Sequence, residues 1–207
     1  SGNELSIFQN LMSTNESGER LLLAAPYSQY ARLEASYAKA IRFGHDDSRA
    51  LAFRVLAGAG VAYGNSTALP YEKQFYVGGA GSMRGWQARA LGPGSAKLDK
   101  TFSIPSQTGD IKLEADLEYR FPMMWKLEGA LFAEVGNVWK AEQGVNLGEL
   151  AADWGIGFRV NLDILVLRID WGIRLRDPSL DGDKWLSPLS ALKSKGSALH
   201  FGVGYPF

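Results

Sequence analysis

Apolar and polar residues alternate along most of this chain with a period of two, which is the pattern of a β-strand with one apolar and one polar face. The clearest example is segment 111–121, where Leu113 and Leu117 alternate with Glu114 and Asp116. Seven more segments alternate less regularly: about 4–12, 29–43, 49–63, 126–139, 154–162, 165–176 and 199–207. The pattern predicts an all-β fold of about eight strands.

The polar faces of these strands carry many charges of both signs, including Arg32, Glu134 and Asp170. A lipocalin-like barrel or a sandwich would bury the apolar faces instead, and this soluble alternative stays open. Two features favour a membrane barrel whose apolar face contacts lipid. Aromatic residues recur near strand ends on the apolar face, as in interfacial girdles. A hydrated lumen can pair the charges, whereas a basic residue at mid-bilayer costs about 2–4 kcal/mol.

The connections between the predicted strands alternate in length. The long ones are 13–28, 64–110, 140–153 and 177–198, and the short ones are 44–48, 122–125 and 163–164. In an up-and-down antiparallel sheet, alternate connections emerge at the same end. Outer-membrane barrels show this asymmetry, with short periplasmic turns and long outer loops. The sequence therefore predicts an antiparallel up-and-down transmembrane β-barrel in a bacterial outer membrane, with Phe207 on the periplasmic side.

Composition excludes several other classes of protein. The 22 Lys and Arg balance the 22 Asp and Glu, so the basic excess of a nucleic-acid binder is missing. With no cysteine and two histidines, neither a metal site nor a cofactor is expected. No apolar stretch approaches the roughly 18 residues of a transmembrane helix. Gly-x-Ser-x-Gly and His-Glu-x-x-His motifs are absent from the sequence, and we expect no enzymatic activity.

The connection 64–110 is far longer than the roughly 12 to 15 residues at which an unstructured loop becomes unusual. Its centre contains Gly78 and Gly79, followed by Met83-Arg84-Gly85-Trp86. This resembles the loop-six motif of the outer-membrane insertase and translocator superfamily of BamA- and TamA-like proteins, also called the bacterial surface antigen domain. Met83 stands where a β-branched residue is usual.

Three later segments resemble the same family in the same order. They are Leu117–Pro122, Leu131–Trp139 and Gly155–Arg159, with Glu134 where aspartate is commoner. The family's barrel has sixteen strands preceded by periplasmic POTRA repeats. The resemblance implies that residues 1–207 form the C-terminal half of such a barrel, with loop 64–110 folded inward and the upstream strands and POTRA repeats outside this chain. The start at Ser1-Gly2-Asn3, without Met, fits that expectation.

Arg84 presents a planar fork of donors that suits carboxylates. The resemblance nominates Glu118 and Glu134 as its partners. If 122–125 is the turn, Glu134 lies nearly opposite Glu114, with Glu118 about 13 Å further along the strand. We therefore expect Arg84 to choose between Glu118 and a Glu114/Glu134 pair, in a bond worth about 1.5–3 kcal/mol that pins the loop inside the barrel.

The last predicted strand places Phe201, Val203, Tyr205 and Phe207 at alternate positions. This resembles the sorting signal read by the barrel-assembly machinery, which works by adding a strand to an exposed sheet edge. Pro206 departs from the simplest pattern, because it removes a backbone donor.

The function implied by the resemblance is insertion or translocation of client proteins at a Gram-negative outer membrane. Its partners would be outer-membrane lipid, client outer-membrane proteins and accessory proteins of an assembly complex. In the family the first and last strands meet at a weak seam, so the isolated 207 residues are expected to be inactive. A passive pore and a membrane anchor for an upstream patatin-like lipase remain alternatives.

Overall fold

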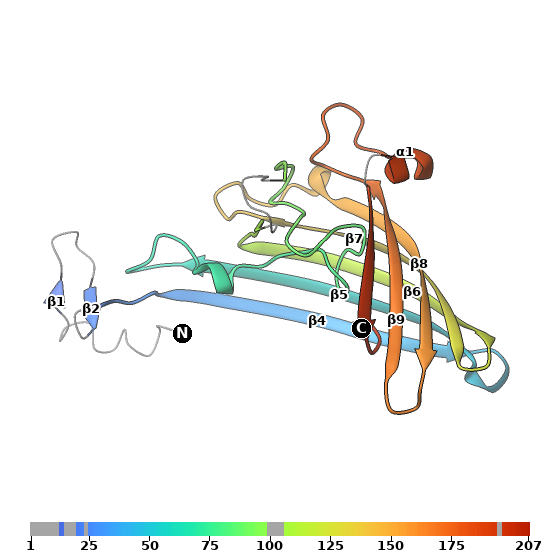
Figure 1. Cartoon of the computed structure of the whole chain (residues 1–207). Coiled ribbons are helices and arrows are strands. Elements are labelled where there is room, and N and C mark those ends of the chain that lie inside the picture. Colours follow the sequence, from blue (N-terminus) through green and yellow to red (C-terminus); the bar gives the residue numbers. More distant parts are fainter. Residues whose placement is uncertain (1–12, 15–19, 23–24, 99–105, 194–195) are drawn as a thin grey trace.

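The computed structural model describes residues 13–14, 20–22, 25–98, 106–193 and 196–207. Its main feature is one antiparallel sheet of seven strands in the order β10-β9-β8-β7-β6-β5-β4 (Figure 1). The strands are β4 (Tyr30–Phe43), β5 (Arg49–Ala62), β6 (Ile111–Met124), β7 (Leu127–Trp139), β8 (Ala151–Asn161), β9 (Val166–Arg176) and β10 (Ser197–Val203). A separate small sheet comprises β1 (Ser13–Thr14), β2 (Arg20–Leu22) and β3 (Ala25–Pro26).

Every strand of the main sheet pairs with its neighbours in sequence, so the up-and-down topology is confirmed. The predicted strand at 4–12 lies outside the described residues. Within the described part of the chain the sheet curves but does not close into a barrel, and β4 and β10 form its two edges (Figure 1).

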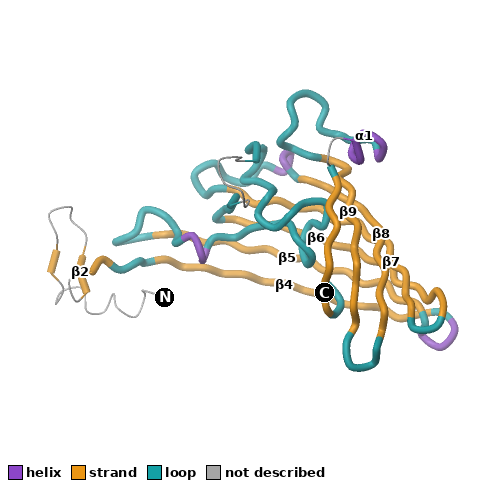
Figure 2. The backbone as a smooth tube through the Cα atoms, viewed as in Figure 1, coloured by secondary structure: helices purple, strands orange, loops and turns teal. Residues whose placement is uncertain are grey.

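The tight turns gather at one end of the sheet and the long connections at the other, as the alternation of lengths predicts (Figure 2). A short helix, η2 (His45–Asp47), lies in the turn between β4 and β5. The long connections contain η3 (Tyr71–Lys73), η4 (Leu147–Glu149) and α1 (Pro188–Lys193). None of the helices in the described ranges is long and apolar enough to cross a membrane.

The turn between β6 and β7 lies further along the chain than the sequence predicts. Met124 pairs with Leu127, which leaves Trp125 and Lys126 as the turn, and the register shifts near Pro122. The predicted turn at 122–125 is therefore wrong, because the ladder continues past the proline through an irregularity.

The position of the turn at Trp125 and Lys126 decides which carboxylates of β6 and β7 face each other. Glu134 pairs with Asp116 rather than with Glu114. Glu118 is two residues from Asp116, which is about 7 Å by strand rise. Glu118 and Glu134 are therefore near enough to hold one guanidinium between them.

The sheet turns its apolar side chains outward. Leu33 is 76% exposed and Phe201 is 71% exposed, whereas Glu118, Arg159 and Asp170 on the opposite face are completely buried. A water-soluble core would show the reverse, so the soluble alternative does not fit this sheet. The charged inner face is covered by the connection between β5 and β6, which folds back over it (Figure 1).

Candidate functional site

The loop between β5 and β6 has a small apolar core of its own. Isolated bridges pair Phe75 with Gly109 and Val77 with Leu91, which bring the two arms of the loop together. The buried residues of this core are Phe75, Val77, Met83, Trp86 and Leu91, and they pack with Val138 of β7 and Ala151 of β8. The described part of the loop is therefore folded and packed against the ends of these two strands.

The glycine pair makes the sharp turn that directs the motif at the sheet. Gly78 and Gly79 have φ values of 96° and 104°, which only glycine adopts readily. The amide of Gly79 donates to the carbonyl of Trp86 at 2.9 Å and closes the turn. A Cβ on Gly78 would lie 2.2 Å from the carbonyl oxygen of Gln87. The geometry thus requires glycine at position 78 in particular.

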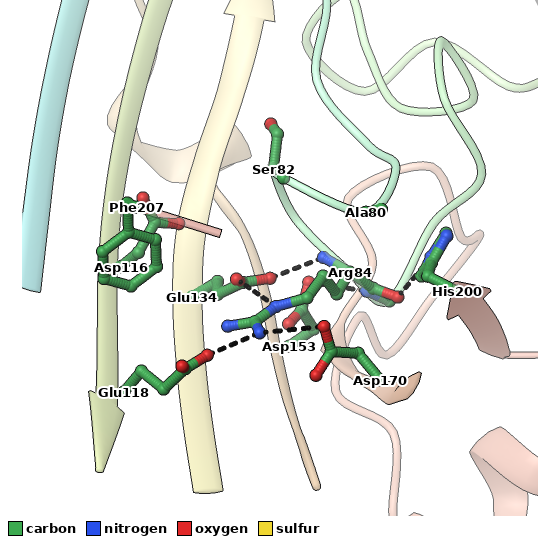
Figure 3. A network of polar contacts seen from close by, with 12 residues as sticks. Ala80, Ser82, Arg84, Asp116, Glu118, Glu134, Asp153, Asp170, His200 and Phe207 are labelled. Carbon is green, nitrogen blue, oxygen red and sulfur yellow. Dashed lines mark hydrogen bonds and ion pairs between the residues drawn. The ribbon is translucent and has the colours of Figure 1, made fainter. Parts of the chain in front are cut away.

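Arg84 projects from this turn into the charged inner face of the sheet (Figure 3). Its Nη1 donates to Glu118 Oε2 at 2.6 Å and its Nε donates to Glu134 Oε1 at 2.7 Å. Asp170 Oδ2 is 3.5 Å from Nη1, and the guanidinium carbon lies 3.5 Å from the centre of the Phe132 ring. The side chain is fully buried.

Burial alone would lower the pKa of the Arg84 guanidinium. The charges of Glu134, Glu118 and Asp170 outweigh that effect and raise its pKa, so the side chain remains protonated. Its hydrogen bonds to these carboxylates are charge-assisted, and they fix both the position and the orientation of the planar guanidinium.

The backbone of the motif is held as firmly as its side chain. The amide of Arg84 donates to Glu134, and the amide of Gly85 donates to Asp153 Oδ2 at 2.9 Å. Four side chains contact carbonyls of the turn: Arg168 on Ala80, Arg54 on Gly81, His200 on Arg84 and Arg174 on Gly85, at 2.7 to 3.0 Å. These groups come from strands β5, β7, β8, β9 and β10, so the motif ties most of the sheet together.

Ion pairs connect the buried charges around Arg84. Glu118 pairs with Arg84, Arg120 and Arg159, and Asp170 pairs with Arg159 and Arg168. Arg159 bridges Glu118 at 2.9 Å and Asp170 at 2.7 Å. Each buried charge therefore has opposite charges nearby, which offsets the cost of removing it from water.

Glycines on the inner face of β8 and β9 leave space for this cluster. A Cβ on Gly172 would lie 2.2 Å from the carbonyl oxygen of Arg84, and one on Gly157 would lie 2.1 Å from Asp170 Oδ1. A Cβ on Gly155 would meet the Phe132 ring at 2.3 Å. The loop can approach β9 this closely only because Gly172 carries no side chain, and Gly155 and Gly157 leave room for the side chains of the sheet itself.

The structure brings Arg84 to Glu118 and Glu134 together, so no choice between them is needed. Glu114 does not take part in this contact. Its carboxylate instead bonds Arg54, Ser82 and Lys112. The expected Glu114/Glu134 pair is a wrong prediction, because it rested on the misplaced β6–β7 turn.

Asp153 lies in β8, whereas the alternation of the sequence places it in the connection 140–153. The register shifts between Ala152 and Asp153, which hides the start of β8 from a strict alternation test. One signal was available, because Asp153 precedes Trp154 and therefore continues the polar face of the strand.

The predicted last strand extends too far. Strand β10 ends at Val203, and Gly204 has a φ of 80°. Phe201 and Val203 point outward and are both 71% exposed. Tyr205 and Phe207 lie against inner-face arginines instead, because the chain turns at the glycine.

The described residues contain no group of three or more His, Asp or Glu side chains arranged to hold a metal ion. The carboxylates of the inner face are directed at guanidinium and backbone N–H groups. The arrangement serves to hold a loop in place.

An antiparallel sheet with apolar residues outside, ions inside and a loop folded onto the ionic face is typical of outer-membrane β-barrel proteins. A family comparison agrees: the Omp85 superfamily domain matches residues 17–207. The chain belongs to the Omp85 superfamily.

Two BamA proteins are similar to parts of this chain. It is 34% identical over 82 residues to the outer membrane protein assembly factor BamA of Neisseria meningitidis serogroup B, a match covering 37% of this chain and 10% of that protein. The fold resembles the crystal structure of BamA from Haemophilus ducreyi lacking POTRA domains 1–3, with a TM-score of 0.60 and 15% identity. That match covers 77% of this chain and 34% of the other, so the chain spans only part of the length of either relative.

Proposed function

We propose that this chain is the C-terminal part of an outer-membrane protein assembly factor, which inserts or translocates client proteins at a Gram-negative outer membrane without enzymatic chemistry. The observation that carries the proposal is the buried Arg84, held by Glu118 and Glu134 on the inner face of an Omp85 sheet. The relative that shares 34% identity is named an assembly factor.

In the proposed mechanism the strands that hold the loop form a stable part of the sheet, and β10 forms a weaker edge. Strands β5 to β9 contribute the carboxylates and arginines that hold the loop. Strand β10 is an edge of only seven residues, whereas β4 at the other edge has fourteen. An edge strand exposes unpaired backbone donors and acceptors to which another strand can add.

In this proposal the loop keeps strands β5 to β9 in place until the edge at β10 opens toward lipid. The missing partner of that edge would be the first strand of a complete barrel, upstream of this chain. Client strands would meet the edge while their apolar side chains remain in the bilayer, which avoids exposing backbone groups to hydrocarbon.

The test uses the complete polypeptide reconstituted in liposomes, with the folding rate of a urea-denatured outer-membrane barrel as the client assay. Glu118→Gln and Glu134→Gln each remove a charge from Arg84, and both variants should slow client folding. Glu114→Gln acts on a neighbouring network and is the matched control, with a smaller effect. Equal activity in all three variants would contradict the role of the loop lock.

The same preparation separates the alternative functions. A passive pore would conduct steady ionic current in planar bilayers and leave client folding unaccelerated. A membrane anchor for an enzyme would neither conduct a steady current nor accelerate client folding.

A further inference from the structure

The residues that follow β10 enter the charged inner face. Arg120 lies 4.3 Å from the centre of the Tyr205 ring, and Arg54 lies 5.1 Å from the centre of the Phe207 ring. The hydroxyl of Tyr205 donates to Glu128 Oε2 at 2.9 Å. Figure 3 shows Phe207 on the same side of the sheet as the Arg84 cluster. The edge strand therefore continues into a segment, residues 204–207, that has its own contacts inside.

Arg120 links this segment to the carboxylate that holds Arg84. Its Nε donates to Glu118 Oε1 at 2.7 Å, and its Nη2 donates to the carbonyl oxygen of Phe207 at 3.1 Å. The other oxygen of Glu118 accepts from Arg84 at 2.6 Å. Arg120 and the carboxylate of Glu118 thus connect the segment after β10 to the loop motif.

His200 makes a second link, from within β10 itself. It faces inward opposite Asp170, and its Nε2 lies 3.0 Å from the carbonyl oxygen of Arg84. A carbonyl can only accept, so Nε2 carries the hydrogen in this contact. The edge strand is consequently tied to Arg84 at two places, through His200 directly and through Arg120 and Glu118.

We propose that Arg120 and His200 are positioning residues that join the edge strand β10 and residues 204–207 to the Arg84 loop, so that the loop and the edge are released together. The inference concerns how the sheet edge is held and does not depend on client insertion. Its physical basis is that every link in the chain of contacts is a hydrogen bond to a buried charged group or to the loop backbone.

Amide hydrogen exchange of the complete polypeptide in lipid nanodiscs tests this, read in two peptides: the loop at 79–86 and the edge at 197–203. Arg84→Lys perturbs the loop side, and Arg120→Met perturbs the edge side. In each variant both peptides should exchange faster by the same factor, about tenfold, which corresponds to loss of one charge-assisted hydrogen bond.

A pair of milder variants tests the same link with all ion pairs intact. His200→Ala should accelerate both peptides, whereas His200→Gln should restore slow exchange, because the glutamine amide can donate to the Arg84 carbonyl. The histidine pair decides the question even if the arginine variants fail to assemble.

The control is Arg176→Met, which removes an inner-face arginine whose bonds go to the carbonyls of Gly148 and Leu150. It should leave both peptides unchanged. If Arg84→Lys accelerates only the loop peptide, or if His200→Ala accelerates neither peptide, loop and edge are independent and the inference is wrong.

Discussion

Replacing Gly172 by alanine should loosen the loop from the sheet. The new Cβ would lie 2.2 Å from the carbonyl oxygen of Arg84, 2.3 Å from its carbonyl carbon and 2.6 Å from the amide nitrogen of Gly85. These are backbone atoms, so no side chain can rotate away. Ordinary contact begins near 3.4 Å, and the loop must therefore retreat by about 1 Å from the inner face of β9.

The magnitude follows from what that movement disturbs. Overpacking of this kind costs about 1–3 kcal/mol. The displaced backbone also carries the contacts of Arg84 with His200 and of Gly85 with Asp153, at 3.0 and 2.9 Å. Without any clash, alanine in place of glycine would stabilise a strand by about 0.5–1 kcal/mol. The sign of the change therefore distinguishes the two possibilities.

Urea unfolding of the complete polypeptide in detergent, followed by tryptophan fluorescence, measures the change in the free energy of unfolding. Trp86 on the loop is 1% exposed and would report its release. Gly81→Ala is the matched control, since a Cβ at Gly81 would meet no atom within 4 Å. We expect a loss of about 1–3 kcal/mol for Gly172→Ala and a change within about 0.5 kcal/mol for Gly81→Ala. Equal unfolding midpoints for the two variants would refute the close packing of loop on strand.

Three further predictions test other parts of the structure. Arg84→Met leaves buried carboxylates without their guanidinium and should lower the free energy of unfolding by about 3–5 kcal/mol; an unchanged urea midpoint would contradict this. Phe201→Arg puts a charge on the outward face and should lower the free energy of unfolding in lipid vesicles by up to about 2–4 kcal/mol, depending on the depth of the residue in the bilayer. The matched variant His45→Arg, at an exposed turn, should change it little. Asn137→Ala removes bonds to the carbonyls of Gly94 and Glu149 and should speed proteolysis of the loop near residue 94, whereas cleavage at the wild-type rate would show that these bonds do not hold it.

Alternation by itself predicted the seven strands of the main sheet and their two faces. Segment 111–121 reads as a strand because its charged and apolar residues change sides at every step, and the structure keeps all of it within β6. The lengths of the connections likewise predicted the up-and-down order, because alternate connections must share an end. These are local properties, which a chain expresses wherever it is placed.

Tertiary structure decided which carboxylates meet Arg84. A shift of the β6–β7 turn by two residues moved Glu134 from Glu114 to Asp116, and no local pattern encodes that register. The link from Arg84 through Glu118 to the residues after β10 joins positions far apart in the chain. Such contacts depend on how seven strands curve around one loop, because the charges on the inner face acquire specific partners only when that curvature brings them within hydrogen-bond distance.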